Sequence, residues 1–335
     1  MDNLTHSLVG ALLGQAGLKR KTGLAMPALV IGANLPDVDA ACFFWLEGQE
    51  HLGFRRGITH GPPAMVLLPL ILAGLLWGYD RWQAKRGKRP EGRLPVHFGW
   101  LYGLSLLACL THPALDWLNV YGVRLLEPFS SQWFYGDTLF IIDVWLWALM
   151  GFATWFSLRR EKKGGEWIKP ARAALAVSLA YIGLNGVISS LAVGYHSELS
   201  ETDERISSPI PLAFWEREVL HGGEGDWFVE RDVPVAFLAL TTSERSSTEG
   251  TGIQTTLQPM TSKSCELPNL EELKGKDSEV DAFIFWTRAP FAESAEDGSV
   301  LLRDARFYDP RARDRFTVAL PDVRCKPLSR EPPGG

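Results

Sequence analysis

The sequence predicts an α-helical integral membrane bundle followed by a small, mainly antiparallel β domain. Long runs without Asp, Glu, Lys or Arg recur before residue 197 and are absent after it. The charge balance also changes, because residues 1–197 hold 18 Lys and Arg against 13 Asp and Glu, whereas residues 198–335 hold 16 against 26. Ten of the 13 tryptophans lie in the first part. Two chemically different halves therefore meet near residue 197.

The same composition excludes several classes of protein. Collagen-like, disulfide-dense, coiled-coil and disordered chains have compositions that this sequence lacks. No basic face interleaved with aromatic residues stands out, so we expect no nucleic-acid partner.

The N-terminal region contains two uncharged runs that are short for a membrane span. They cover residues 3–18 and 22–36 and are separated by the basic cluster at residues 19–21. A secretory signal peptide has its basic residues before the apolar run, whereas here they follow it, so we expect this region to be retained. The two runs form either two short spans or a hairpin of re-entrant helices. Either arrangement returns the chain to the side on which it starts.

Four later runs have the apolar character of membrane spans. About 20 apolar residues are needed to cross ~30 Å of hydrocarbon. Residues 61–79, 94–115 and 173–197 meet this requirement without a formally charged side chain. A fourth run, residues 144–158, is long enough if it extends backward across Asp143 and that carboxylate lies near an interface.

The distribution of basic residues predicts the orientation of the bundle. The segments 19–21, 80–95 and 159–172 together carry 15 Lys and Arg, and only three remain elsewhere in the first 197 residues. Short basic loops stay in the cytoplasm. We therefore expect a multi-pass protein of a bacterial inner membrane with its C-terminal domain on the periplasmic side. The other outer segments are residues 37–60 and 116–138.

The second half contains strand-like segments separated by Gly, Pro, Asp and Ser, which is typical of β-structure. We expect a β-rich domain over residues 198–326, which begins with a short helical or irregular link and contains a loop at 241–248. Residues 327–335 are expected to form a disordered tail. The strand-like segments are residues 227–242, 280–288, 299–307 and 315–320.

Cysteine usage agrees with this topology. Cys265 and Cys325 lie in the exported half, where disulfides form, so we predict that they pair. Cys42 and Cys109 lie in or near apolar segments and have no partner at a metal-binding spacing.

Ionisable side chains gather at the predicted outer ends of the helical segments. Such groups are costly near a membrane core and usually mark function. Because the sidedness comes from Lys and Arg alone, this convergence is an independent observation. The residues are His6, Asp37, Asp39, His60, His112, Asp116 and Asp143.

We interpret this set as the ligands of one or two divalent metal ions. Imidazole and carboxylate donors without thiolate suit zinc, manganese or iron better than calcium or magnesium, with zinc favoured. His112 and Asp116 are four residues apart and share one helical face. Other roles stay open for single members: a lone interfacial histidine can be structural, Asp39 and Asp143 can be helix N-caps, and Asp116 can pair with Arg124.

Six short motifs carry a resemblance to a known family. They are residues 1–6 (MDNLTH), 35–39 (LPDVD), 56–60 (RGITH), 111–116 (THPALD), 125–130 (LLEPFS) and 141–143 (IID). With these motifs in this order, residues 1–195 resemble the membrane-bound metal-dependent hydrolase family of YdjM-like inner-membrane proteins. The resemblance implies hydrolase activity but says little about the substrate.

A more distant resemblance is to zinc-dependent phospholipase C and the P1-type nucleases, which hold a cluster of zinc ions with His and Asp. His112 and Asp116 match the His-x-x-x-Asp pair of those enzymes, and Asp37 or Asp39 and His60 are the plausible counterparts of other ligands. A later His-x-x-x-Glu helix has no counterpart in this chain. The resemblance therefore implies one or two ions rather than three.

The expected activity is hydrolysis of a phosphoester at the outer membrane surface. Of Asp37 and Asp39, one would bind metal while the other accepts the proton of the attacking water. Arg56, with Arg55 and Arg124 nearby, would hold a phosphate bidentately or contact lipid headgroups. The site's depth points to a lipid or lipid-linked substrate. The alternative is a non-enzymatic membrane metal-binding or scaffold protein whose β domain binds a partner.

Overall fold

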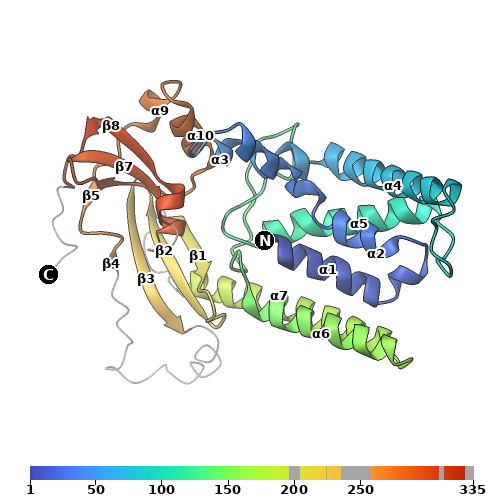
Figure 1. The fold of residues 1–335 in the computed structure, drawn as a ribbon. Coiled ribbons are helices and arrows are strands. Elements are labelled where there is room, and N and C mark those ends of the chain that lie inside the picture. The colour runs from blue at the N-terminus through green and yellow to red at the C-terminus, as the bar shows by residue number, and fades with distance from the viewer. Residues whose placement is uncertain (196–203, 224, 235–257, 309–312, 329–335) are drawn as a thin grey trace, which may run out of the picture. The chain divides into compact units, whose positions relative to one another are not determined.

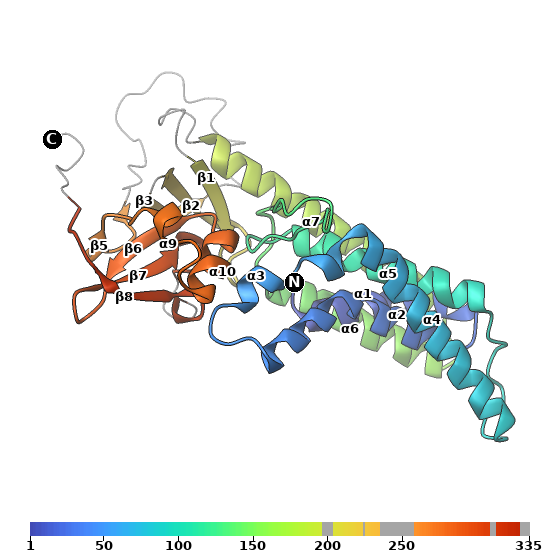
Figure 2. The same cartoon turned by 90° about the horizontal axis from the view of Figure 1, so that it is seen from above.

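The computed structural model describes residues 1–195, 204–223, 225–234, 258–308 and 313–328. These residues form two compact units, one helical and one that contains all the described strands (Figure 1; Figure 2). The predicted fold class, a helical membrane bundle followed by antiparallel β-structure, is confirmed.

Neither unit is a single continuous stretch of the chain. The helical unit contains Met1–Ala40, Arg56–Val187 and Pro211–Phe214. The β unit contains Ala41–Arg55, Ile188–Ile210 and the chain from Trp215 onward. The predicted domain limits at residues 197 and 326 stay predictions, and residues 329–335 of the predicted tail lie outside the described residues.

The helical unit is a bundle in which successive long helices run in opposite directions (Figure 1). Its α-helices are α1 (Asn3–Gln15), α2 (Ala25–Gly32), α4 (Pro62–Lys85), α5 (Phe98–Trp117), α6 (Val144–Lys162) and most of α7 (Ile168–Tyr195). Short 3₁₀ helices cover Leu18–Arg20, Leu35–Phe44 and Ile58–His60. The uncharged runs of the sequence supply these helices, because in a bilayer a helix satisfies its own backbone polar groups.

Three of the described helices, α4, α5 and α7, are long and apolar enough to cross a membrane. The helix α2 and the 3₁₀ helix over Leu35–Phe44 pass the same test as a pair bent by 54°, which fits a broken span or a re-entrant loop. The 19-residue helix α6 carries Arg159, Arg160 and Lys162 in its last turn and is not among these candidates. A span at α6 therefore stays a prediction.

Close packing places α1 beside α2. A Cβ atom on Gly10 would lie 2.5 Å from the carbonyl oxygen of Leu29 in α2, so a larger residue would push the helices apart. Two apolar clusters fill the remaining space, one around α1 and α6 and one around α2, α4 and α5. Their buried members include Leu12, Leu139, Leu146 and Met150 in the first cluster and Leu29, Leu101, Leu104 and Ala108 in the second.

The segment between α5 and α6 is extended and folds back onto the end of α5. Val123 and Phe134 form an antiparallel bridge with hydrogen bonds of 3.0 and 2.9 Å in both directions. The carbonyl oxygen of Leu118 accepts from the backbone N–H of Thr138 at 2.8 Å. These contacts hold the segment against the end of α5 that carries His112 and Asp116.

The β unit contains two antiparallel sheets (Figure 1). The first has the order β1-β2-β3-β4, with β1 Glu204–Pro209, β2 Glu216–Gly223, β3 Asp226–Pro234 and β4 Gln258–Pro259. The second has the order β5-β6-β7-β8, with β5 Ser264–Cys265, β6 Pro290–Ser294, β7 Ser299–Asp304 and β8 Val318–Arg324. Short helices complete the unit: α3 (His51–Phe54), α9 (Leu270–Leu273), α10 (Ser278–Trp286) and 3₁₀ turns at Ala305–Phe307 and Arg313–Phe316.

The strand predicted over residues 280–288 is wrong, because this segment forms α10. Asp277 starts the helix: its carboxylate accepts from the backbone N–H groups of Glu279 and Val280 at 2.8 and 3.1 Å.

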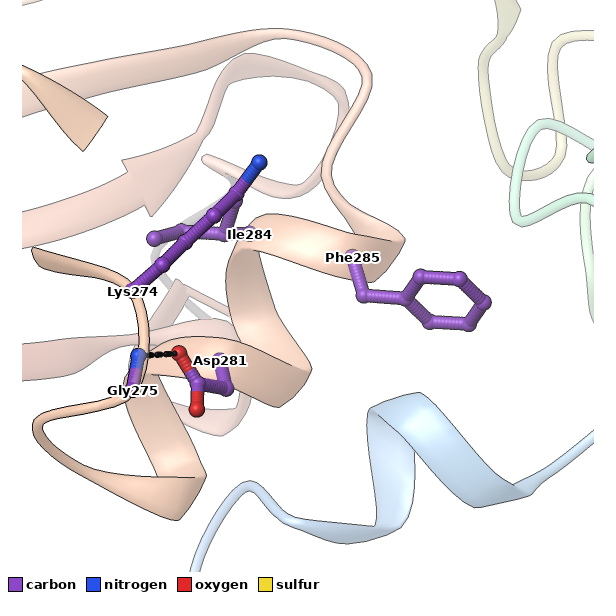
Figure 3. A pocket seen from close by; sticks show the side chains of 5 residues that line it. All are labelled: Lys274, Gly275, Asp281, Ile284 and Phe285. Carbon is purple, nitrogen blue, oxygen red and sulfur yellow. Dashed lines mark hydrogen bonds between the residues drawn. The ribbon is translucent and has the colours of Figure 1, made fainter. Parts of the chain in front are cut away.

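A pocket of about 470 Å³ lies beside α10 (Figure 3). In it, the Asp281 carboxylate accepts from the backbone N–H of Gly275 at 2.8 Å. Lys274, Ile284 and Phe285 complete its lining.

Other expectations for the β unit were correct only in part. The predicted strand at 299–307 ends at Asp304, and the one at 315–320 begins as a 3₁₀ turn. The link expected after residue 198 contains strands β1 and β2. Residues 227–234 lie in β3, whereas residues 235–242 and the predicted loop at 241–248 lie outside the described residues.

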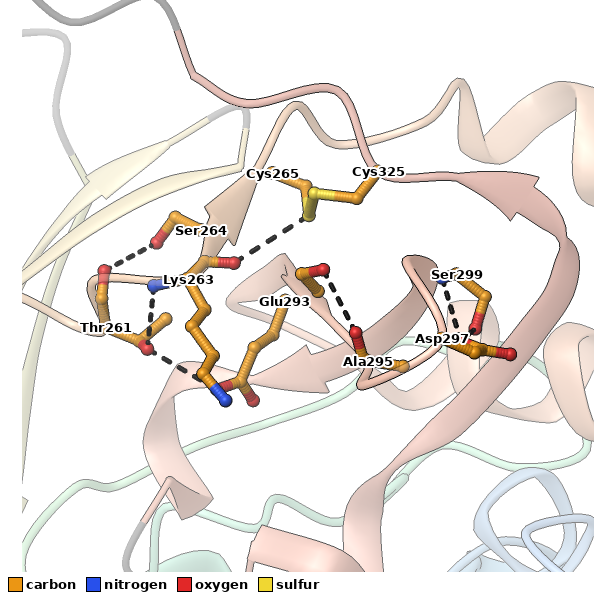
Figure 4. Close-up of a disulfide and its surroundings, with 10 residues drawn as sticks. Thr261, Lys263, Ser264, Cys265, Glu293, Ala295, Asp297, Ser299 and Cys325 are labelled. Atoms are coloured by element: carbon orange, nitrogen blue, oxygen red, sulfur yellow. Dashed lines mark hydrogen bonds between the residues drawn. A yellow bond between two sulfur atoms is a disulfide. The ribbon is translucent and has the colours of Figure 1, made fainter.

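The predicted pairing of Cys265 and Cys325 is confirmed. Their disulfide links β5 to the residue that follows β8, across 60 residues of chain (Figure 4). The bond therefore ties together the two outermost strands of the second sheet. Cys42 and Cys109 are buried and take no part in a disulfide.

Candidate metal centre

Six of the predicted site residues come together at one end of the helical unit, near the chain start marked in Figure 1. They come from different elements: α1, the 3₁₀ helix over Leu35–Phe44, the 3₁₀ helix over Ile58–His60, and the last turns of α5. The residues are His6, Asp37, Asp39, His60, His112 and Asp116.

The start of α1 is fixed by a polar cap, which orients His6. The carboxylate of Asp2 accepts from the backbone N–H groups of Leu4 and Thr5 at 2.9 and 3.1 Å. The indole N–H of Trp147 in α6 lies 3.2 Å from Asp2 Oδ2 and 3.0 Å from Thr5 Oγ1. The His6 ring is fully buried one turn into the helix and stacks on His112, with 3.7 Å between ring centroids.

His112 and Asp116 lie on one face of α5, as their spacing predicts. The helix continues through Pro113 to Trp117. His112 Nδ1 lies 2.7 Å from the carbonyl oxygen of Ala33 in the segment that follows α2. A backbone carbonyl takes a proton from Nδ1, so this contact leaves Nε2 as the nitrogen with a free lone pair.

The carboxylate of Asp116 is the centre of the cluster and is fully buried. Its oxygens lie 3.4 Å from His6 Nε2, 3.4 Å from His60 Nε2 and 3.6 Å from His112 Nε2. Arg56 Nε is 3.2 Å away, and the amino nitrogen of Met1 also contacts Asp116. Three imidazoles and a guanidinium therefore surround one carboxylate.

The distances within this cluster fit metal ligands better than hydrogen bonds. An N–H···O hydrogen bond is about 2.9 Å long, shorter than any of these imidazole–carboxylate contacts. Two atoms bound tetrahedrally to one zinc ion at about 2.0–2.1 Å lie roughly 3.3–3.4 Å apart. Among the described residues, the Nε2 atoms of His6, His60 and His112 are buried and have no hydrogen-bond partner. The residues present thus fit a divalent ion with nitrogen and oxygen ligands.

Two overlapping groups of residues can supply such ligands. His60, His112 and Asp116 form one group, and His6, Asp37 and His112 form the other, each with its ligand atoms within 4.8 Å of one another. Asp37 Oδ1 is 3.7 Å from His112 Nε2. Because His112 has one available nitrogen, it can serve only one of the two groups at a time. Because both groups need the same His112 nitrogen, the arrangement favours a single ion over two separate sites.

Asp39 has a different role from Asp37. Its Oδ2 accepts from the backbone N–H of Arg56 at 2.8 Å and from Thr59 Oγ1 at 3.0 Å. Thr59 Oγ1 lies 3.0 Å from His60 Nδ1, and Asp39 lies 3.6 Å from the same nitrogen. Asp39 and Thr59 therefore orient the His60 ring so that Nε2 faces Asp116. Burial lowers the pKa of His60, which favours the neutral ring that binds metals.

Arg56 is buried at the site in a left-handed backbone conformation, with φ of 55°. Its Nη1 donates to Asn119 Oδ1 and to the Gly122 carbonyl oxygen, both at 3.1 Å, and its guanidinium stacks on Tyr121 at 4.5 Å. Such strained conformations persist where the surroundings over-determine them, often at functional sites. The guanidinium is thus held rigidly beside Asp116.

Asp143 does not join either group of ligands. It is the N-cap of α6, where its Oδ1 accepts from the backbone N–H groups of Trp145 and Leu146 at 3.0 and 2.9 Å. Its Oδ2 accepts from the hydroxyl of Tyr181 in α7 at 3.0 Å. Sequence reasoning left this role open beside the metal role, and the geometry favours the cap.

The alternative pairing of Asp116 with Arg124 is also not the arrangement found. Arg124 forms an ion pair with Glu127 at 3.1 Å, and Arg56 takes the place beside Asp116. Sequence reasoning missed Asn119 and Thr59, which hold Arg56 and His60. The sequence offers one hint of these roles: Asn119 lies three residues after Asp116, and Thr59 lies immediately before His60.

Comparisons with known proteins indicate that this chain is a membrane protein, and they assign it no activity. A profile of the YdjM inner membrane protein family matches residues 1–192. The uncharacterized protein YfhP of Bacillus subtilis is 29% identical over 141 residues, which are 40% of this chain and 39% of YfhP. The chain thus spans well under half the length of that curated relative. No solved structure matches, so the similarity to zinc-dependent phospholipase C and P1-type nucleases gains no support.

The geometry predicts that the protein binds zinc through His112. We expect the protein purified in detergent to hold zinc after dialysis, and His112→Ala to weaken that binding by about a hundredfold or more, since a ligand is lost. Equilibrium dialysis with metal analysis measures both. His97→Ala is the matched control, because His97 lies exposed at the opposite end of the same helix. Equal zinc affinity in His112→Ala and the unmodified protein would contradict the site.

Proposed function

We propose that this chain, which belongs to the YdjM inner membrane protein family, is a membrane-bound metal-dependent hydrolase that acts on a phosphoester. The observation that carries the proposal is the set of three buried imidazole Nε2 atoms that lie 3.4–3.6 Å from the Asp116 carboxylate, none of which has a hydrogen-bond partner among the described residues. Burying such groups without a partner is costly, and a bound cation removes that cost.

Zinc suits this donor set best, and manganese and iron are the alternatives that the same donors accept. His60, His112 and Asp116 would hold the ion, with His6 as a further ligand. A bound divalent ion lowers the pKa of water to about 7 and polarises a phosphoryl oxygen, which is the chemistry that hydrolysis needs.

Asp37 is the better candidate for the group that accepts the proton of the attacking water. Its carboxylate lies 3.7 Å from His112 Nε2, whereas the Asp39 carboxylate accepts from the backbone N–H of Arg56 and from Thr59. Asp39 already accepts from Arg56 and Thr59, so its role is to position His60. The two carboxylates, which the sequence leaves equivalent, are therefore assigned different roles.

Arg56 supplies positive charge for an anionic substrate. Its Nε and Nη1 are engaged by Asp116, Asn119 and the Gly122 carbonyl, which fixes the plane of the guanidinium. A rigid guanidinium beside a metal centre suits the oxygens of a phosphoryl group, because it places charge where charge develops in the transition state.

The membrane setting favours a lipid or lipid-linked phosphoester. The site lies where α5 ends and α4 begins, whereas the basic turns after α4 and α6 lie at the other end of the helical unit (Figure 1). The distribution of basic residues predicts that this other end is cytoplasmic. The site would then face the periplasm, at the depth of the outer-leaflet headgroups.

Hydrolysis of a chromogenic phosphodiester by the zinc-loaded protein tests the activity. We expect Asp37→Asn to lower kcat by about 10²–10⁴-fold, because it removes a general base, while measured zinc content stays close to that of the unmodified protein. Asp143→Asn is the matched control: asparagine is an equally good N-cap, so α6 and the activity should be retained.

Two outcomes of this assay would contradict the proposal. Turnover that is unchanged in Asp37→Asn would remove Asp37 from the reaction. Full zinc occupancy with no turnover of phosphodiesters or phosphomonoesters would favour the alternative, a metal-binding scaffold protein.

The proposed orientation predicts which loops a membrane-impermeant maleimide reaches. In cells with a permeabilised outer membrane, Ser131→Cys between α5 and α6 should be labelled, and Lys88→Cys between α4 and α5 should react only after lysis. Both positions are exposed, and the unmodified protein is the background control because Cys42 and Cys109 are buried. Labelling of Lys88→Cys but not Ser131→Cys in unlysed cells would reverse the orientation.

A further inference from the structure

One segment of the β unit is inserted into the middle of the metal-site sequence. Residues 41–55 fold with the β unit, although the residues before and after them belong to the helical unit. The segment begins two residues after Asp39 and ends immediately before Arg56. The chain therefore leaves one site carboxylate, folds with the β unit, and returns at the site arginine.

The neck of this excursion is closed by site residues. Asp39 Oδ2 accepts from the backbone N–H of Arg56 at 2.8 Å, which joins the two ends of the excursion. The Arg56 carbonyl oxygen accepts from the backbone N–H of Arg124 at 2.9 Å, which ties the neck to the segment after α5. The same Asp39 oxygen binds Thr59, which orients His60. A displacement of the neck would therefore move His60 and Arg56.

The far part of the excursion is held by the first turn of α10. Glu279 Oε2 accepts from the backbone N–H of Gln49 at 2.8 Å, and Ser278 Oγ donates to Glu50 Oε1 at 2.5 Å. Gly48 has φ of 45°, and a Cβ atom there would lie 2.1 Å from the Glu279 carboxylate. A side chain at residue 48 would displace the Glu279 carboxylate, and the positive φ independently favours glycine at this position.

The helix α3 within the excursion also packs against α10. A Cβ atom on Gly53 would lie 3.3 Å from Cβ of Ala282, one turn after Glu279. The absence of a side chain at Gly53 lets the two helices meet closely. Polar contacts at residues 48–50 and close packing at residue 53 therefore attach both parts of the excursion to one short helix.

We propose that α10 of the β unit is a positioning element for the metal site, and that Glu279 is its main positioning residue. This inference rests on the proposed metal site. An excursion of this length without an anchor samples many conformations, and ordering its ends on metal binding then costs conformational entropy. Held by α10, the ends are ordered beforehand, and Asp39, Arg56 and His60 keep their places. Groups that bond directly to metal ligands typically change metal affinity by about 10–100-fold, and Glu279 acts one step further away, so the lower end of that range is expected.

Zinc affinity of Glu279 variants tests the inference. In the full-length protein, competition with a chromophoric chelator should show that Glu279→Ala raises the Kd for zinc about tenfold. Glu279→Gln should stay near the unmodified protein, because its amide oxygen can still accept from Gln49. Glu271→Ala is the matched control: Glu271 is exposed on the neighbouring helix α9, pairs with Lys274, and does not touch the excursion.

A disulfide that replaces the Glu279 contact separates positioning from folding damage. The 3.3 Å between the Cβ positions of residues 53 and 282 is a few tenths of an ångström short of the usual spacing across a disulfide, about 3.8 Å. Gly53→Cys with Ala282→Cys should therefore form a bond on oxidation. Added to Glu279→Ala, this bond should restore the zinc affinity, whereas Gly53→Cys alone should not.

The possible outcomes distinguish failure of the metal site from failure of the positioning role of α10. Absence of zinc binding by the unmodified protein overturns the proposed metal site and, with it, this inference. Zinc binding that is equally tight in the unmodified protein and in Glu279→Ala overturns only the positioning role of α10. A weakened Glu279→Ala variant that the verified disulfide fails to restore also overturns the positioning role.

Discussion

The structure of the helical unit depends on one buried carboxylate. Asp116 is fully buried among three imidazoles and the guanidinium of Arg56, and a buried charge is stable only when its partners are held in place. Those partners come from α1, from residues 56–60 and from α5 itself. The Asp2 cap and the close contact at Gly10 fix α1, which contributes His6. The contacts of Asp39 with Arg56 and Thr59 fix the segment that contributes Arg56 and His60. The same requirement explains why the site cannot be built from α5 alone.

Much of the fold was predictable because membrane helices have a strong signal. Runs without charge gave α4, α5 and α7, and the spacing of His112 and Asp116 placed both on one face. The roles of the aspartates were not predictable. Asp143 caps α6, and Asp37 differs from Asp39 only because the Arg56 N–H and Thr59 reach Asp39; such contacts span many residues and leave no local pattern. In the β unit, residues 280–288 read as a strand because their apolar residues suit either structure, and the Asp277 cap decided for a helix.

The excursion at residues 41–55 is the part of the β unit that lies between two site residues in the sequence. Sequence reasoning placed that segment with the membrane part, since it lies between two site motifs. Its association with α10 depends on Gly48 and Gly53, where the missing side chains admit Glu279 and Ala282. A glycine has no hydrophobic signal, so this attachment is invisible to composition. Through it, a domain without any proposed ligand of its own contributes to the geometry of the site in the helical unit.

X-ray absorption at the zinc edge tests the central claim most directly, namely that histidines from separate segments bind one ion. For the protein loaded with one equivalent of zinc, the account predicts a first shell of nitrogen and oxygen at about 2.0–2.1 Å with outer-shell scattering from at least two imidazoles. The His112→Ala protein should lose one imidazole from that shell. A shell of oxygen atoms only, or a sulfur scatterer at about 2.3 Å, would contradict the account.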